Sequence, residues 1–373
     1  MIIVMKAEVE PDSSEIARVV AMAEGFPGIQ TQVKHIRGAS RTVTEIYLLG
    51  GTGVIPTAPF EEFASVEKVV RVTEKYRTIG RHQGRSESVG FECNGVQITQ
   101  ENLTLFPGLC AVDTRENVER TFRALAEHGI QTARAGAYKP RTSPYDFQGH
   151  GAACLPFVFE LAGKYGIRIV AMEVTRDSQL EEIDQALERA GRPTAVMLQI
   201  GTRNAQNFEL LKAVGQQEEF PVLFKRGMGI TLEESLNACE YVASGGNHRI
   251  IFCLRGMKTN FGDPHRNLVD FTHVPVVKRQ TRLPVCIDPS HSVGRRSVAV
   301  DGLLDIYHAT AQGVIAGANV VLVDFHPAPE EALCDGPQAL LLPELPHFLE
   351  DVAIARRAYE ERVKLRERLN APD

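Results

Sequence analysis

The sequence predicts an α/β fold, a (β/α)8 TIM barrel preceded by a small amino-terminal ferredoxin-like α+β domain. Two observations predict the barrel. After residue 104, apolar runs of strand length alternate with helical patterns eight times, which is typical of a closed parallel sheet. Each run ends near a cysteine or a charged residue, and only the C-terminal strand ends of a barrel reach its cavity. These residues are Cys110, Arg134, Glu173, Arg203, Lys225, Arg255, Asp288 and Asp324.

Residues 1–75 predict the order β-α-β-β-α-β of a ferredoxin-like unit. Strands are expected at 2–9, 31–36, 42–49 and 69–73, where β-branched and apolar residues gather. One helix is expected from the cap region at 12–14 to about residue 24, and a short second helix over 60–66. Residues 76–103 are expected to form a linker and a hairpin, so the barrel occupies residues 104–373.

The eight barrel strands are expected near 104–110, 132–136, 167–173, 196–200, 220–224, 249–253, 284–288 and 319–324. Helical patterns lie between them, including 114–128, 180–190, 204–214, 231–244 and 301–316, and a long charged helix is expected over 345–369. A doubly wound open sheet is the alternative fold. It is less favoured because it does not need a functional group at every strand end.

Composition narrows the class of ligand. The 373 residues are 43% hydrophobic with a formal net charge of −6 and both signs interspersed, which argues against a nucleic-acid partner. Seven cysteines without a CxxC pair favour a reducing compartment, and we expect a cytoplasmic protein. The chain lacks a signal-peptide pattern and any apolar stretch of 18 residues, so no membrane partner is expected.

Cations follow several predicted strands and indicate an anion-binding site. The segment 134–145 holds Arg134, Lys139, Arg141 and Thr142 in a loop with two prolines, which restrict the backbone. Residues 199–204 join a glycine and Arg203 to a helix start, a combination that suits phosphate. Lys225 and Arg255 end the next two strands. The alternative is that these side chains are solvated or pair with carboxylates on the rim.

Thiol, imidazole and carboxylate groups also converge on this rim. Asp288 and His291 follow strand seven, Asp324 ends strand eight, and Cys110 and Asp335 complete the set. Mixed sulfur, nitrogen and oxygen donors predict a divalent ion, Mn²⁺, Fe²⁺, Co²⁺ or Zn²⁺, without distinguishing among them. The alternative is a histidine with a purely structural hydrogen bond.

Five motifs together resemble those of a known family over almost the whole chain. They are Lys-Pro-Arg-Thr-Ser-Pro-Tyr at 139–145, Gln-Ile-Gly-x-Arg-Asn at 199–204, Leu-x-Lys-Arg-Gly at 223–227, Asp-Pro-Ser-His at 288–291 with Gly-Arg-Arg at 294–296, and Asp-Gly-Pro-Gln at 335–338. The chain resembles the 3-deoxy-D-arabino-heptulosonate 7-phosphate (DAHP) synthases of the type I-beta group. These transferases condense phosphoenolpyruvate with erythrose 4-phosphate in the first step of the shikimate pathway.

The resemblance implies roles for the residues that match its motifs. Phosphoenolpyruvate would be held by Arg134, Lys139, Arg203, Lys225 and Arg255, and the sugar phosphate would face Arg141 and Thr142. The implied metal ligands are Cys110, His291, Asp324 and Asp335. Lys139 and Asp288 are candidates for proton handling. The resemblance further implies a homo-oligomer, a dimer or tetramer, and an aromatic amino acid effector that binds the amino-terminal domain.

Four positions, at three places in the chain, depart from the family pattern. Leu109 and Ala111 flank the cysteine where the family has Pro and Ser, Leu254 replaces a Glu, and Asp324 replaces a Glu. Because aspartate is one methylene shorter, its oxygen is expected to fall about a bond length short of a ligand distance of roughly 2.1 Å. Two other functions therefore stay open: a related phosphoenolpyruvate-dependent synthase that uses another aldose phosphate or aldehyde in specialised metabolism, and a catalytically silent small-molecule sensor.

Overall fold

The computed structural model describes residues 1–37, 42–71, 76–82, 86–260 and 264–369. The chain divides into two compact units, Met1–Arg77 and Thr78–Asp373. Residues 72–75, at the end of the predicted first domain, and 83–85, in the predicted linker, lie outside the described residues.

The first unit is a four-stranded antiparallel sheet with two helices. Its strands are β1 Ile2–Met5, β2 Gln30–Arg37, β3 Thr42–Leu49 and β4 Val66–Val70, in the order β2-β3-β1-β4. Helix α1, Ser14–Glu24, begins where the Ser13 hydroxyl accepts a hydrogen bond from the Ile16 amide. Its buried face packs on the sheet through a core that includes Ile3 and Ile46. This is the predicted ferredoxin-like arrangement.

Three boundaries in the first unit differ from the prediction. Strand β1 ends at Met5, because the Lys6 amide bonds to Ser65 outside the ladder. Helix α2 spans Ala58–Glu61 rather than 60–66, with a proline in its first turn that favours an early start. Strand β4 then begins at Val66 instead of residue 69, since the buried Val66 pairs with Met5.

The second unit is a closed parallel barrel. Its strands are β7 Thr104–Leu109, β8 Thr132–Ala135, β9 Ile169–Val174, β10 Ala195–Ile200, β11 Val222–Lys225, β12 Ile250–Leu254, β13 Val285–Ile287 and β14 Val320–His326. Each strand pairs with the next in sequence, and β14 pairs with both β13 and β7. This last pairing confirms the (β/α)8 barrel and rules out the open sheet. A short strand, β15 Leu340–Leu341, extends the ladder beside β14.

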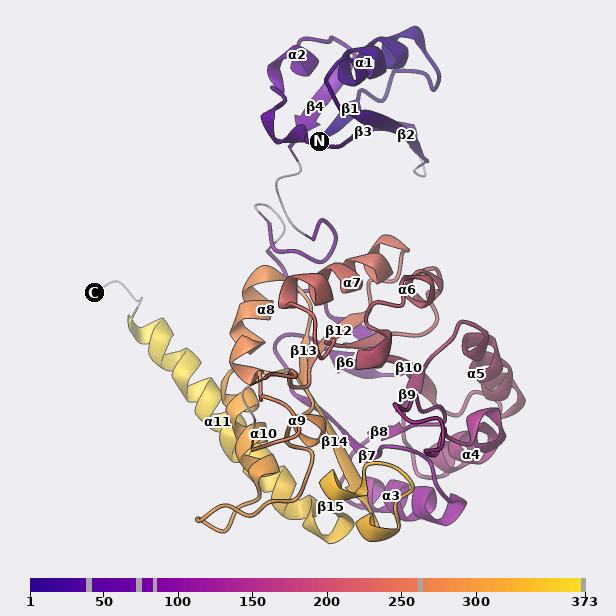
Figure 1. The fold of residues 1–373 in the computed structure, drawn as a ribbon, viewed down its shortest axis with the longest axis vertical. Coiled ribbons are helices and arrows are strands. Elements are labelled where there is room, and N and C mark those ends of the chain that lie inside the picture. Colours follow the sequence, from indigo (N-terminus) through magenta and orange to yellow (C-terminus); the bar gives the residue numbers. More distant parts are fainter. Residues whose placement is uncertain (38–41, 72–75, 83–85, 261–263, 370–373) are drawn as a thin grey trace. The chain divides into compact units, whose positions relative to one another are not determined.

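Helices surround the barrel strands (Figure 1). They are α3 Arg115–Glu127, α4 Leu155–Lys164, α5 Ser178–Arg189, α6 Phe208–Gly215, α7 Leu232–Ser244, α8 Val274–Gln280, α9 Pro289–Val293, α10 Asp305–Ile315 and α11 Leu345–Leu369. Helices α6 and α10 begin four residues later than predicted. Asn207 caps α6, so the expected start at 204 is instead a 3-10 turn. Residues before α10 form a bridge between Val298 and Leu304.

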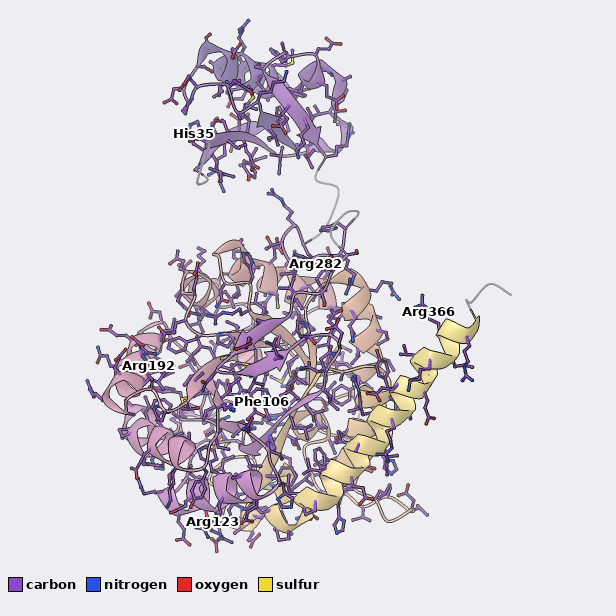
Figure 2. All side chains as sticks on the ribbon, turned by 180° about the vertical axis from the view of Figure 1, so that it is seen from behind. His35, Phe106, Arg123, Arg192, Arg282 and Arg366 are labelled. Carbon is purple, nitrogen blue, oxygen red and sulfur yellow. The ribbon has the colours of Figure 1, made fainter. Side chains whose placement is uncertain are left out.

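Apolar side chains fill the inside of the barrel, around Phe106 (Figure 2). The hairpin of β5 Phe91–Cys93 and β6 Val96–Ile98 packs into the same cluster. Asn94 in its turn donates to the carbonyl of Arg168, just before β9, so the hairpin covers the N-terminal strand ends. The opposite end is left for the cavity. Among the described residues, no helix combines the length and apolarity needed to cross a bilayer.

Candidate active site

A cavity of about 200 Å³ lies at the C-terminal ends of the barrel strands. Its size suits a small ligand, and cationic side chains dominate its lining. They are Lys139, Arg141, Arg203, Lys225, Arg255 and Arg266. Thr142, Glu173, His291, Cys334 and Asp335 also line it. Strands far apart in the sequence therefore bring the predicted cations to one place.

Arg255 is the cation with the fewest protein partners in this cavity. It follows β12 directly and is only 2% exposed. Within the described part of the chain, its Nε and Nη1 have no hydrogen-bond acceptor, and burial lowers its pKa. The preceding residue, Leu254, offers no carboxylate. Because buried donors without acceptors are costly, Arg255 is suited to a bound anion.

The loop after β10 comes close to the floor of the cavity because residue 201 is a glycine. A Cβ atom at Gly201 would lie 1.8 Å from Oε1 of Glu173, so no other residue fits there without displacing that carboxylate. The following residues form a 3-10 turn, Thr202–Asn204. From this turn Arg203 donates to the Thr142 hydroxyl at 3.0 Å. Two predicted ligand-binding segments thus meet at the cavity.

Arg134 lies at the C-terminal end of β8, as the sequence suggested, but deeper than the other predicted cations. It is not among the residues that line the cavity; its guanidinium is buried beneath, in an ion pair with Asp324. Its Nη2 lies 3.5 Å from the thiol of Cys110. In this arrangement Arg134 supports the cluster below the cavity through Nη1 and Nη2, and its buried Nε has no hydrogen-bond partner among the described residues.

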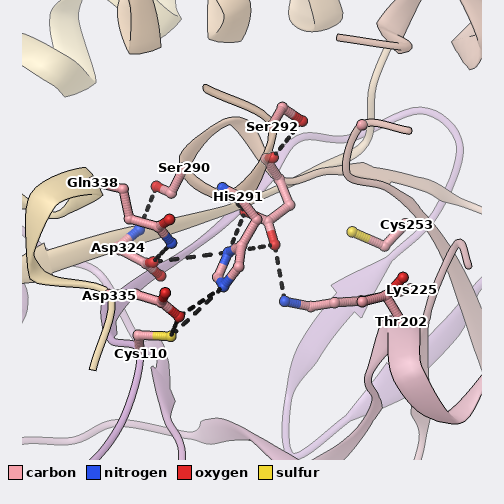
Figure 3. Close-up of polar contacts among 12 residues, drawn as sticks. Cys110, Thr202, Lys225, Cys253, Ser290, His291, Ser292, Asp324, Asp335 and Gln338 are labelled. Atoms are coloured by element: carbon pink, nitrogen blue, oxygen red, sulfur yellow. Dashed lines mark hydrogen bonds and ion pairs between the residues drawn. The ribbon is translucent and has the colours of Figure 1, made fainter. Parts of the chain in front are cut away.

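Three donor atoms of different chemistry meet beside the cations (Figure 3). Cys110 Sγ lies 3.2 Å from Asp335 Oδ2 and 3.6 Å from His291 Nε2, and the last two atoms are 3.6 Å apart. Ligands around one tetrahedral ion with bonds of about 2.0–2.3 Å are separated by roughly 3.3–3.8 Å. The donor set therefore fits a single divalent ion.

Helix α9 orients the imidazole of this cluster. Asp288 is its N-cap and accepts from the His291 amide at 3.1 Å, and a proline follows at the first helical position. One turn later His291 Nδ1 lies 3.0 Å from Asp288. When Nδ1–H donates a hydrogen bond to this carboxylate, Nε2 carries the lone pair and points toward Cys110 and Asp335. Metal-binding histidines adopt this arrangement.

Asp324, the fourth predicted ligand, has other partners. One of its oxygens pairs with Arg134, and the other accepts from Gln338 Nε2 at 2.5 Å. It approaches His291 at Nδ1, 3.8 Å away, rather than at Nε2. Cys110, His291 and Asp324 nevertheless offer donor atoms within 4.8 Å of one another.

Comparisons with known proteins identify the family of this chain. The sequence model of the DAHP synthetase I family matches residues 82–358. A curated phospho-2-dehydro-3-deoxyheptonate aldolase of Thermotoga maritima is 37% identical, over 91% of this chain and 93% of its own. The chain belongs to the DAHP synthetase I family. The resemblance inferred from the motifs is thereby confirmed.

Solved structures place this family member in the same fold. A crystal structure of the DAHP synthase of Thermotoga maritima matches with a TM-score of 0.69 at 34% identity, covering 96% of this chain and 97% of the other. A truncated form of DAHP synthase from Thermotoga maritima matches 79% of this chain and 97% of its own with a TM-score of 0.62 and 33% identity. A 2-dehydro-3-deoxyphosphooctonate aldolase of Alkalilimnicola ehrlichii is 28% identical over 66% of this chain and 88% of its own.

Neighbouring charges favour the charged forms of Asp335 and His291 in the cluster. Burial alone would raise the pKa of Asp335, but His291, Lys139 and Arg266 hold it well below its usual range. Burial would lower the pKa of His291, yet the charges of Asp288 and Asp324 raise it to about 10. Without a bound ion, the imidazole and its carboxylates thus form a charged network.

Lys139 and Asp288, the candidates for proton handling, lie at different depths. The Lys139 ammonium lines the cavity, 3.3 Å from Cys110 Sγ and 3.4 Å from Glu173. Asp288 is fully buried behind Lys225 and His291, with its Oδ2 2.8 Å from Lys225 Nζ. Of the two, only Lys139 can reach a molecule in the cavity directly.

Three residues of the site were not predicted. Arg266 donates to Asp335 at 3.0 Å and to Gln338 at 2.9 Å, and Cys334 lies at the cavity wall. Gln338 in turn holds Asp324. Arg266 stands in a loop without a strand to mark it, so no periodicity signals it. Cys334 directly precedes the motif at 335–338 and Gln338 is its last residue, so the motif itself was an available signal.

Proposed function

We propose that the chain condenses phosphoenolpyruvate with erythrose 4-phosphate and water to give DAHP and phosphate, the first step of the shikimate pathway. One observation carries the proposal: a cavity lined by six cations adjoins a thiol, imidazole and carboxylate cluster in a member of the DAHP synthetase I family. Both substrates are anionic, and the reaction joins C3 of phosphoenolpyruvate to the aldehyde carbon.

The cations divide between the two substrates in this proposal. Lys225, Arg255, Lys139 and Arg203 hold the phosphate and carboxylate of phosphoenolpyruvate, with Arg134 supporting them from below. Arg141 and Thr142 face the sugar phosphate. Such fixed donors stabilise the charge that develops as water adds at C2 and phosphate leaves. Lys139 is the group in the cavity that transfers a proton during the reaction, and Asp288 positions Lys225 and His291.

A divalent ion, Mn²⁺, Fe²⁺, Co²⁺ or Zn²⁺, is the proposed cofactor. Cys110, His291 and Asp335 would hold it, with Asp324 as the fourth predicted ligand. When bound, the ion supplies a Lewis acid that polarises the aldehyde oxygen. The residues present fit such an ion, because their donor atoms are 3.2–3.6 Å apart, close to the separation of ligands around one tetrahedral ion.

We further propose a homo-oligomer, a dimer or tetramer, whose amino-terminal unit binds an aromatic amino acid effector. The effector role is supported by the ferredoxin-like strand order of the first unit, whose described residues include none of those that line the cavity. A cytoplasmic location is proposed from the cysteines. All seven lie in the described residues as free thiols, which suits a reducing compartment.

The test follows loss of phosphoenolpyruvate and appearance of DAHP with a panel of aldose phosphates. We expect turnover with erythrose 4-phosphate, its loss on chelation and its return with added metal. Full activity in an exhaustively chelated, metal-analysed sample would contradict the metal requirement. Turnover with neither erythrose 4-phosphate nor any other aldehyde would favour the silent sensor.

A second candidate is a related phosphoenolpyruvate-dependent synthase with another aldehyde substrate. Leu109, Ala111, Leu254 and Asp324 favour it, because they change the surroundings of the cysteine, of Arg255 and of the cluster. The similarity to 2-dehydro-3-deoxyphosphooctonate aldolases is a further reason. Faster turnover with an aldehyde other than erythrose 4-phosphate in the same panel would establish this candidate.

A further inference from the structure

Cys334 places a second thiol at the cluster, and the proposed function so far does not use it. It immediately precedes Asp335, which adopts a left-handed backbone conformation with φ of 54°. Cys334 Sγ lies 3.3 Å from Asp335 Oδ2, the same oxygen that Cys110 Sγ approaches at 3.2 Å. Cys110, Cys334 and Asp335 offer donor atoms within 4.8 Å of one another. Two thiols therefore face one carboxylate oxygen.

Asp324 was expected to be the fourth ligand of the ion, but its contacts in the structure leave that ligand position open to another residue. Asp324 uses both oxygens on Arg134 and Gln338, and it lies on the Nδ1 side of His291. The other three predicted donors meet on the Nε2 side. Its buried ion pair with Arg134 holds the carboxylate on that side.

The charges around Cys334 suit a thiolate ligand. Two thiolates and one carboxylate around a divalent ion leave one net negative charge. Arg141 Nη1 lies 2.7 Å from Cys334 Sγ, and Lys139 Nζ lies 3.3 Å from Cys110 Sγ, so each sulfur has a cation beside it. The cations compensate the additional anionic ligand in this buried place.

We propose that Cys334 is a ligand of the divalent ion, which is then held by two thiolates, one imidazole and one carboxylate. This inference rests on the proposed function, because it completes the site of the same cofactor. Thiolates favour Zn²⁺, whereas oxygen ligands suit Mn²⁺. The second sulfur therefore shifts the preference of this chain toward Zn²⁺ and away from Mn²⁺.

The first test needs no substitution. The full chain is loaded with one equivalent of Zn²⁺, and X-ray absorption at the zinc edge counts the sulfur neighbours. We expect two sulfur atoms at about 2.3 Å. A single sulfur neighbour would overturn the proposal.

The second test counts thiolates with Co²⁺ as the probe. Thiolate-to-cobalt charge-transfer absorption in the full chain should fall by about half in Cys334→Ser and in Cys110→Ser. Cys154→Ser is the matched control, because this buried thiol bonds to the Gly151 carbonyl and lies outside the cluster. Its absorption should equal that of the unsubstituted chain. An undiminished band in a folded Cys334→Ser chain would overturn the proposal.

Competition between Zn²⁺ and Mn²⁺ gives a third readout that is independent of turnover. Cys334→Ser should lower the Zn²⁺ to Mn²⁺ affinity ratio at least tenfold, while Cys154→Ser leaves it unchanged. DAHP formation is measured on the same unsubstituted samples. A chain that forms DAHP with one sulfur on its zinc would overturn this inference alone, whereas a chain with two sulfurs that forms no DAHP would overturn the proposed function alone.

Discussion

Arg255 carries a charge that the described protein groups leave largely unmatched. Its neighbour Leu254 stands where the family has a glutamate, and two of its guanidinium nitrogens lack acceptors among the described residues. A ligand anion is then its main hydrogen-bonding partner. At the scale of single residues, this makes Arg255 the cation whose loss should affect substrate binding most.

We expect Arg255→Ala to weaken phosphoenolpyruvate binding by about 2–4 kcal/mol, because it removes a buried, charge-assisted contact. Arg203→Ala should cost less, since Arg203 is more exposed and retains a protein partner in Thr142. Titration calorimetry measures both. Arg115→Ala, which breaks an exposed ion pair with Glu160, is the control and should bind normally. Unchanged affinity in both cavity variants would refute the anion site.

Asp324→Glu tests the length of the carboxylate in the cluster. The longer side chain restores the reach that the family's glutamate has, so metal affinity should be maintained or should increase. In a Cys334→Ser background it should restore Co²⁺ binding without restoring the lost charge-transfer absorption. Asp146→Glu, at a carboxylate that pairs with Arg141 instead, is the control. A weaker metal affinity in folded Asp324→Glu would contradict this expectation.

At the scale of elements, helix α8 carries a lysine whose charge is poorly accommodated. Lys278 donates to the carbonyls of Gly317 and Gln100, at 2.9 and 3.3 Å. Burial, with Arg356 close by, lowers its pKa to about 8. The unfolded chain holds this proton up to about pH 10.4, so between these values the unfolded state binds more protons. The free energy of unfolding should therefore rise with pH in this window.

This contribution amounts to about 3 kcal/mol between pH 8 and pH 10.4. Below pH 8 the buried charge of Lys278 lowers the free energy of unfolding by this full amount, and the effect disappears as the pH rises from 8 toward 10.4. Urea unfolding at several pH values should show a smaller rise in Lys278→Met than in the unsubstituted chain. Lys212→Met, at an exposed lysine of α6, should leave the slope unchanged. Equal slopes for Lys278→Met and the unsubstituted chain would show that Lys278 titrates normally.

At the scale of the whole molecule, the chain consists of two units with separate cores. The barrel unit begins at Thr78, and the amides of Thr78 and Ile79 donate to Glu240 at 2.7 and 3.1 Å. A chain shortened to Thr78 keeps these contacts. The truncated form of the Thermotoga maritima DAHP synthase, which matches 79% of this chain, supports the expectation that such a barrel folds.

We expect tyrosine or phenylalanine to inhibit the full chain and to have no effect on the chain that begins at Thr78, which should stay active. Control of this kind requires an effector that favours one state of the protein, typically by about 1–3 kcal/mol. Inhibition curves of the two forms are the measurement. Identical curves would refute a regulatory first unit, and a shortened chain that does not fold would assign that unit a structural role.

The local pattern of the sequence was sufficient for the barrel and for most of the cations. Buried parallel strands must be short continuous apolar runs, so β7 to β14 could be placed within a few residues. Barrel closure brings all C-terminal strand ends to one face, which is why Lys225 and Arg255 could be assigned to a common cavity before any contact was known. The resemblance of five motifs to those of DAHP synthases also indicated the family that the comparisons confirm.

Only the tertiary structure decided which partner each charged group takes. Arg134 and Asp324, 190 residues apart in sequence, form a buried ion pair that the sequence did not indicate. Cys334 becomes a candidate ligand because its sulfur and that of Cys110 reach the same oxygen of Asp335. Which groups pair depends on distances of about 3 Å between atoms of distant segments, as between Cys110 and Asp335, and periodicity or spacing along the chain carries no information on such distances.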